Sequence, residues 1–294
     1  MLSIGPEHIH DAVIDDRRVR YLDVGEGGLC VLLVHGLGGC WQHWRQIVSD
    51  LARHARVLAL DLPGFGASEP AAGAVSLEGF ADLAATLARS MDCTRVVLAG
   101  HSLGGPVAVR FAARHPDLAA GIVLVAGAVY QFSALLGLRE VARYARSCPR
   151  ETLAIAAEAV GVGLPMPERV RGSIVNSKML RQIALAPYVR DPQALSADAV
   201  RTILAGAGAR GVRPTIRAIG RSDPFAGIEH VACPILSLAG DADRISPPAD
   251  TERFQREVPR ARTVVLEHCG HMPMLERPRA LTGPIEEFIK GETA

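Results

Sequence analysis

The stretch that decides the fold of this chain is Val96-Val97-Leu98-Ala99-Gly100-His101-Ser102-Leu103-Gly104-Gly105. Its first four residues are apolar and predict a short buried strand, and a helix is expected to begin near Leu103. Between the two, residues 100–104 match the pattern G-x-S-x-G. A glycine two places before and two places after the serine allows a turn too sharp for bulky side chains. The pattern therefore predicts that the hydroxyl of Ser102 is exposed at the carboxyl end of the strand.

Strands and helices alternate on both sides of this stretch. A hairpin is expected from residues 8–14 and 17–24, and the continuous apolar run 29–34 predicts a strand covered on both faces. Apolar residues at helical spacing predict a helix over 41–51. Further strands are expected at 57–60, 122–126, 234–238 and 263–266. This alternation predicts an α/β fold with a mostly parallel, doubly wound sheet, in which ligands bind beyond the carboxyl ends of the strands.

Residues 129–228 break the alternation. They are rich in alanine, arginine and leucine, show helical periodicity, and contain no apolar run typical of a buried strand. We therefore expect an inserted helical cap at 129–228, between two parts of an α/β core at 1–128 and 229–294.

Composition excludes several classes of protein. The chain has 294 residues, a formal net charge of +1 and 49% hydrophobic residues, so neither disorder nor a general attraction to nucleic acid or anionic membranes is expected. Its six cysteines are scattered and indicate neither a zinc site nor a disulfide framework. No secretory signal and no apolar run of about 20 residues is visible. We expect a cytoplasmic protein without metal or cofactor, while the oligomeric state stays open.

The segment around Ser102 resembles the nucleophile elbow of the α/β-hydrolase superfamily, in the Gly-His-Ser-Leu-Gly-Gly form common among its serine esterases and lipases. The resemblance covers nearly the whole chain and is weakest within the expected cap. It implies the α/β-hydrolase fold and a catalytic triad in the chain order nucleophile, acid, histidine.

A serine hydroxyl needs a base to take its proton, and that base needs a partner that fixes its tautomer. His271 matches the family's Gly-His near the C-terminus, whereas the rival His268 belongs to the end of a strand. The family pattern G-x-x-D, followed by an apolar residue and proline, places the acid at Asp243. Asp241 remains an alternative, with a turn-capping carboxylate as its other interpretation.

Negative charge on the substrate oxygen needs backbone N–H donors. The elbow supplies the N–H of Leu103 at the start of a helix, where the dipole also favours negative charge. By resemblance the second donor is Leu37, which follows His35-Gly36. His35 is expected to buttress this loop, and His101 is expected to be structural because its side chain should diverge from that of Ser102.

The resemblance implies a serine hydrolase that forms an acyl-enzyme, with a hydrophobic small-molecule carboxylic ester, lactone or thioester as its substrate. Possible pocket-wall residues from the cap are Tyr130, Phe132, Leu135 and Leu138.

Two alternatives stay open. One is a carbon–carbon bond hydrolase of ring-cleavage products with the same triad, although those relatives usually show a Gly-Pro-Gly-Ala-like loop where this chain has Gly38-Gly39-Cys40-Trp41. The other is a binding protein or receptor of the same fold with little turnover. Dehalogenases and epoxide hydrolases are disfavoured because they use aspartate at the elbow.

Overall fold

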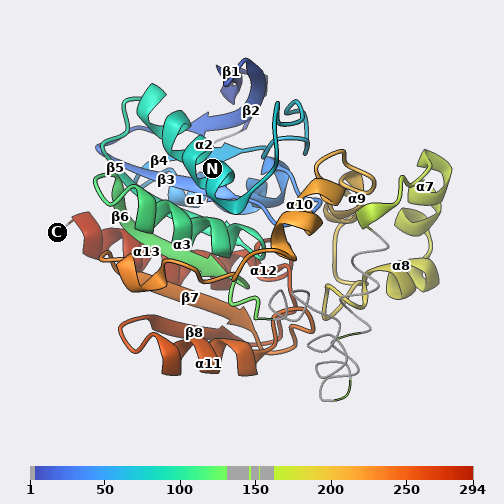
Figure 1. Cartoon of the computed structure of the whole chain (residues 1–294). Coiled ribbons are helices and arrows are strands. Elements are labelled where there is room, and N and C mark those ends of the chain that lie inside the picture. Colours follow the sequence, from blue (N-terminus) through green and yellow to red (C-terminus); the bar gives the residue numbers. More distant parts are fainter. Residues whose placement is uncertain (1–3, 131–145, 147–151, 153–161, 294) are drawn as a thin grey trace.

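The computed structural model describes residues 4–130, 146, 152 and 162–293 and is shown in Figure 1. Its centre is an eight-stranded sheet in the order β1-β2-β4-β3-β5-β6-β7-β8. The strands are β1 Ile9–Ile14, β2 Arg17–Val24, β3 Leu29–Val34, β4 Arg56–Leu60, β5 Arg95–His101, β6 Ala119–Val125, β7 Ile235–Gly240 and β8 Arg262–Leu266.

The sheet is parallel from β4 to β8 and antiparallel only at its first edge. There β1 and β2 form a hairpin whose turn places Asp15 and Asp16 in the left-handed region, and β2 pairs antiparallel with β4. Every residue of β3 and of β7 is buried, as expected for strands covered on both faces. The predicted fold class, a mostly parallel doubly wound sheet, is confirmed.

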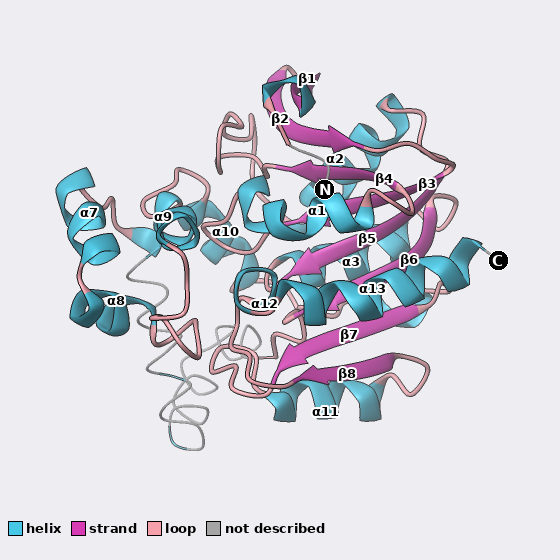
Figure 2. Cartoon of the chain, turned by 180° about the vertical axis from the view of Figure 1, so that it is seen from behind, coloured by secondary structure: helices cyan, strands magenta, loops and turns pink. Residues whose placement is uncertain are grey.

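Helices cover both faces of this sheet. The helical elements are η1 Pro6–His8, η2 Trp41–Trp44, α1 Arg45–Leu51, α2 Leu77–Ser90, α3 Gly104–Arg114, α7 Glu168–Asn176, α8 Lys178–Leu185, α9 Ala197–Ala205, α10 Val212–Ile219, η3 Ile228–His230, α11 Pro248–Glu257, α12 Pro273–Glu276 and α13 Pro278–Thr293. Figure 1 shows α2 and α3 on the near face, and Figure 2, seen from behind, shows α1 and α13 on the other. One apolar core lies on each side of the sheet.

The helix expected over 41–51 is divided into two parts. The 3₁₀ turn η2 comes first and α1 follows, since short 3₁₀ turns are common at the start of an α-helix. The carboxylate of Asp61 accepts the N–H of Trp41 at 2.7 Å and so fixes where the turn begins.

Helices α7 to α10 lie between β6 and β7 in the chain and project beyond the carboxyl ends of the strands (Figure 1). Residues 162–228 contain no strand, in agreement with the helical character expected there. The boundaries proposed for the cap stay a prediction, because 131–145, 147–151 and 153–161 lie outside the described residues. Across the described part of the chain, no helix is both long and apolar enough to cross a membrane.

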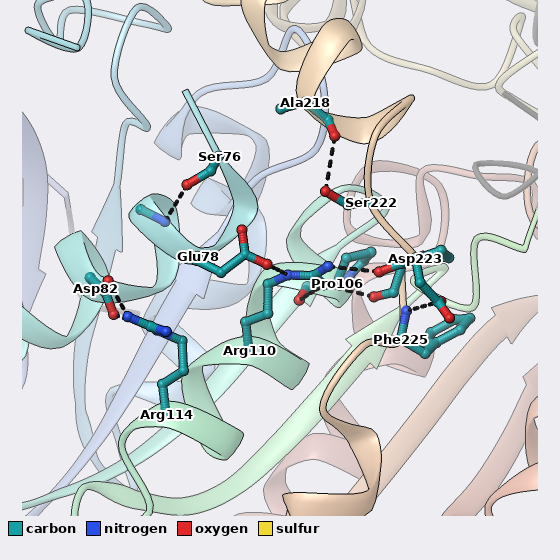
Figure 3. A network of polar contacts seen from close by, with 12 residues as sticks. Ser76, Glu78, Asp82, Pro106, Arg110, Arg114, Ala218, Ser222, Asp223 and Phe225 are labelled. Carbon is teal, nitrogen blue, oxygen red and sulfur yellow. Dashed lines mark hydrogen bonds and ion pairs between the residues drawn. The ribbon is translucent and has the colours of Figure 1, made fainter. Parts of the chain in front are cut away.

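After α10 the chain returns to the core through a segment that contains Asp223 and Pro224, which we call the returning segment. A buried arginine links this segment to α3 (Figure 3). Arg110 lies on α3, and its side chain is only 3% exposed. Its Nε donates to Glu78 of α2 at 2.5 Å, and its two terminal nitrogens donate to the carbonyls of Pro224 at 2.9 Å and Asp223 at 2.6 Å. The helix that follows Ser102 is thereby fixed both to α2 and to the returning segment.

Candidate active site

Ser102 occupies a sharp turn between β5 and α3. Its φ of 50° lies in the left-handed region, which non-glycine residues rarely adopt, and its N–H donates to the carbonyl of Val125 at 3.0 Å. A Cβ atom at Gly100 would collide with the backbone of Gly104, and one at Gly104 would lie 2.5 Å from the carbonyl oxygen of Val34. The turn therefore requires both glycines, as its sequence pattern indicated.

Asp243 and His271 form a buried pair beside this turn. Nδ1 of His271 lies 2.8 Å from Oδ2 of Asp243, and the two side chains are 2% and 0% exposed. The other carboxylate oxygen, Oδ1, accepts the N–H groups of Ile245 and Ser246 at 2.8 Å each. The loop after β7 therefore fixes the carboxylate, and the carboxylate in turn orients the imidazole with Nε2 on the edge remote from Asp243.

Asp241 has different partners. Its two carboxylate oxygens accept the N–H groups of Cys269 and His268 at 2.9 Å each, so it holds the loop that precedes His271 instead of the imidazole. His268 is exposed and has a positive φ of 55°. Of the two aspartates considered from the sequence, the structure thus brings Asp243 to His271.

A third loop, after β3, brings Leu37 to the same place. Residues 36–39 form a turn in which Gly39 N–H donates to the carbonyl of Gly36 at 3.0 Å. Within the described residues, neither the N–H of Leu37 nor that of Leu103 donates a hydrogen bond to another protein group. Leu103 is the N-cap residue of α3 and directly follows Ser102 in the turn, so its backbone N–H lies at the positive end of the helix dipole.

Buried histidines support these loops. His35 accepts the N–H of Leu62 through Nε2 at 3.0 Å, and its Nδ1 lies 2.7 Å from the carbonyl of Gly36. Burial lowers the pKa of His35 to about 3, so the ring is neutral and Nδ1 carries the proton. His101 contacts the carbonyl of His271 through Nε2 at 2.8 Å, and burial together with the nearby His271 lowers the pKa of His101 well below its ordinary value.

Ser102, His271 and Leu37 open into one cavity of about 340 Å³, which we call the candidate pocket. The helices α8 and α9 supply much of its apolar wall, and the described lining includes no Lys, Arg, Asp or Glu. The lining residues are Gly36, Leu37, Gly38, His43, His101, Ser102, Val162, Met166, Ile183, Ala184, Leu185, Pro187, Tyr188, Ile203, Leu204, Ala207, His271 and Met272.

The structure places Tyr130 away from the described lining of this pocket. Its ring packs on Phe225, with centroids 4.7 Å apart, and its hydroxyl donates to Glu257 at 2.5 Å. The guanidinium of Arg253 lies 3.9 Å from the ring centroid. These contacts turn Tyr130 toward α11, which explains the difference from the pocket-wall role expected for it. The other expected wall residues, Phe132, Leu135 and Leu138, lie outside the described residues.

Sequence reasoning missed two polar residues of the site. Glu276 on α12 accepts the N–H groups of Gly270 at 3.0 Å, Met272 at 3.0 Å and Arg190 at 2.9 Å, and so holds the residues on both sides of His271. Burial raises the pKa of Glu276, although these three donors oppose the shift. His43, in the wall of the candidate pocket, is the second. No motif marks either residue. In the described ranges, no cluster of three or more His, Cys, Asp or Glu could hold a metal ion.

The chain is similar in sequence and in structure to known hydrolases. A family model described as alpha/beta hydrolase fold matches residues 30–278. The chain is 27% identical over 274 residues to 2-hydroxy-6-oxo-2,4-heptadienoate hydrolase of Pseudomonas putida, covering 92% of each chain. It is 28% identical over 263 residues to pimeloyl-[acyl-carrier protein] methyl ester esterase of Neisseria meningitidis, covering 89% of this chain and 93% of the relative. A solved structure of a thermophilic esterase from Thermogutta terrifontis is similar with a TM-score of 0.71 and 26% identity, covering 97% of this chain and 99% of that one.

Proposed function

Because the chain belongs to the α/β-hydrolase fold family, we propose that it is a serine hydrolase that cleaves a hydrophobic small-molecule carboxylic ester, lactone or thioester. The observation that carries the proposal is the buried pair of Asp243 and His271, 2.8 Å apart, of which His271 lines the same pocket as Ser102. A serine hydroxyl is a weak nucleophile without such a base, and the base needs a partner that fixes its tautomer.

In the proposed reaction, Oγ of Ser102 attacks the carbonyl carbon of the ester while Nε2 of His271 takes the hydroxyl proton. Asp243 holds Nδ1–H and stabilises the imidazolium. The N–H groups of Leu37 and Leu103 donate to the oxyanion. Collapse of the tetrahedral intermediate expels the alcohol, which receives the proton from His271. Water activated by the neutral imidazole then cleaves the acyl-enzyme and releases the acid.

The wall of the candidate pocket supports an uncharged, mainly apolar substrate. Its described lining is rich in Leu, Ile, Val, Met and Ala and has no charged Lys, Arg, Asp or Glu side chain, and ligand pockets of this kind bind apolar groups through burial. The proposed reaction requires no cofactor. Cys30, Cys40, Cys93 and Cys269 are free thiols, which suits the reducing, cytoplasmic setting that we propose.

Hydrolysis of a carbon–carbon bond is the second candidate. It is favoured by the 27% identity to 2-hydroxy-6-oxo-2,4-heptadienoate hydrolase. The substrate in that name is a carboxylate, and a pocket whose described lining is apolar and contains no Lys or Arg binds a carboxylate poorly. We therefore rank ester hydrolysis first.

Pre-steady-state kinetics test the proposal. With p-nitrophenyl butyrate we expect a burst of one nitrophenolate per active site and a butyryl adduct in the intact mass. The Ser102→Ala variant should lose both, and its kcat should fall by at least about 10³-fold. A ring-cleavage dienone measured in parallel should be turned over more slowly. A low-turnover receptor would show no burst, and faster cleavage of the dienone would reverse the ranking.

A further inference from the structure

One polar side chain in the wall of the candidate pocket has no role in the proposed reaction. His43 lies in η2 between Trp41 and Trp44 and is 5% exposed. Neither ring nitrogen has a hydrogen-bond partner within the part of the chain that the structure describes. The ring lines the same cavity as Ser102 and His271. His43 is therefore a buried hydrogen-bonding group that borders the place where a substrate must sit.

An unsatisfied polar group of this kind is costly. A buried donor or acceptor without a partner loses its hydration and gains nothing in return, so such groups are rare in folded proteins. The carbonyl of Thr202 on α9 is near enough to favour the protonated ring, yet it does not meet hydrogen-bond geometry with either nitrogen. A ligand in the pocket would supply the missing partner.

The charge of the ring limits what that ligand is. Burial lowers the pKa of His43 to about 4, so the ring is neutral at pH 7 and offers one N–H donor and one nitrogen acceptor. A neutral imidazole does not balance the charge of a carboxylate, and no Lys or Arg is among the described lining residues. The partner that fits is an uncharged oxygen, either a keto oxygen or a hydroxyl.

We propose, on the premise that the chain hydrolyses esters through Ser102, that His43 is a specificity-determining residue that hydrogen-bonds a keto or hydroxyl oxygen near the scissile carbonyl of the substrate. The preferred substrate class is then an apolar ester with one neutral oxygen substituent on its acyl chain. Leu204 and Ile203 on α9 line the pocket beside η2, so the rest of the acyl chain contacts apolar groups.

Matched esters test this proposal. The measured quantity is the ratio of kcat/KM for methyl 2-, 3- or 4-oxopentanoate, or the corresponding hydroxypentanoates, to kcat/KM for methyl pentanoate. Comparing this ratio between protein variants cancels the intrinsic reactivity of each ester. For at least one substituted ester, the ratio should fall by about tenfold or more in His43→Leu, because one hydrogen bond of about 1.4 kcal/mol corresponds to tenfold. His43→Asn, which keeps a donor and an acceptor, should restore part of it.

Two controls make the result specific to the pocket. His230→Leu removes an exposed histidine from η3 and should leave the ratio unchanged. His43→Leu also removes an unsatisfied buried imidazole, so the Tm of the unliganded variant should equal or exceed that of the parent protein.

A charged ester tests whether the partner of His43 is neutral. Monomethyl succinate, which carries a carboxylate, should be a poorer substrate than methyl pentanoate. If it is the better one, the assignment of a neutral partner is wrong.

The proposal fails separately from the assignment of Ser102. If every substituted ester keeps its ratio within about twofold in His43→Leu, while hydrolysis still depends on Ser102, the role of His43 is disproved and the triad stands. If Ser102→Ala hydrolyses esters as fast as the parent protein, the proposed reaction is disproved. If Ser102→Ala is inactive, calorimetric binding of the same esters to Ser102→Ala, with and without His43→Leu, decides the role of His43 alone.

Discussion

At the scale of single residues, the hydrogen-bond partners of a side chain separate groups that look alike in the sequence. Asp241 and Asp243 are two positions apart in one turn, yet the first holds the N–H groups of His268 and Cys269 while the second holds Nδ1 of His271. A family pattern favoured Asp243. In the structure, the N–H groups of Ile245 and Ser246 hold Oδ1 of Asp243. The other oxygen, Oδ2, therefore faces Nδ1 of His271.

These partners predict different effects for two conservative substitutions. Asp243→Asn keeps the shape but permits the wrong tautomer of His271, so kcat should fall by about 10³- to 10⁴-fold. Asp241→Asn keeps one of two backbone bonds in an exposed turn and should lower kcat by less than about tenfold. Both are measured on one activated ester, with circular dichroism to establish folding. An inactive Asp241→Asn beside an active Asp243→Asn would show that the acid is misassigned.

The state of His271 predicts the pH dependence of the proposed reaction. A general base accepts a proton only while it is neutral, so kcat/KM should be high where the imidazole of His271 is neutral and should fall as the pH drops and the ring becomes protonated. His35 and His43, with pKa values lowered by burial to about 3 and about 4, are already neutral above pH 5. They should add no second ionisation. The measurement is kcat/KM from pH 5 to 9 with folding checked at each pH, and a flat profile would contradict a titrating base.

At the scale of elements, helix α3 directly follows the turn of Ser102 and carries two arginines in different environments. Arg110 is buried and satisfies the carbonyls of Asp223 and Pro224, whereas Arg114 forms an ion pair with Asp82 in which both side chains are more than 40% exposed. Burial makes the first costly to remove, and solvent makes the second nearly neutral.

Matched substitutions on this helix measure the difference. Arg110→Met leaves Glu78 without its partner and the carbonyl of Pro224 unsatisfied, so the free energy of unfolding should fall by about 2–4 kcal/mol. Arg114→Met should change it by less than about 1 kcal/mol. Urea unfolding at pH 7 gives both values. Equal losses would mean that the network in Figure 3 does not hold the returning segment on α3.

Another contact between elements joins α9 to the loop that carries Leu37. A Cβ atom at Gly206 would collide with the carbonyl of Gly38, whereas one at Gly172 on α7 would meet nothing within 4 Å. Gly206→Ala should displace the loop and lower kcat/KM by about tenfold or more, because a small displacement of a catalytic group is costly. Gly172→Ala is the control and should leave kcat/KM unchanged while slightly raising Tm. Similar values for both variants would disprove this contact as a support of the loop.

The elements themselves were largely predictable from the sequence, because burial on both faces gives strands such as β3 an unbroken apolar run. The division of residues 41–51 into η2 and α1 could not be predicted from the sequence. It depends on a hydrogen bond from Trp41 to Asp61, whose position is set by the tertiary fold. For the same reason the sequence did not place His43 in the pocket wall or turn Tyr130 toward Glu257. Apolar periodicity shows that a helix has a buried face, but not which residues of that face border a cavity.

At the scale of the whole molecule, the sheet order explains how distant segments meet. Strands β3, β5 and β7 are parallel, so their carboxyl ends lie on one side of the sheet. The loops after β3, β5, β7 and β8 carry Leu37, Ser102, Asp243 and His271 to that side, and the helices α8 and α9 cover it. The proposed triad, which runs from Ser102 to His271 in the sequence, therefore requires only the topology of one sheet and the loops at its carboxyl edge.

The most direct test of the central claim is covalent labelling at this site. A fluorophosphonate reacts with a serine only where a base activates the hydroxyl and donors hold the developing oxyanion. We expect one adduct per chain in the intact mass, located by peptide mapping on Ser102, and no adduct in a folded Ser102→Ala variant. Undiminished labelling of that variant, or an adduct on another residue of the parent protein, would contradict the assignment of Ser102 as the nucleophile.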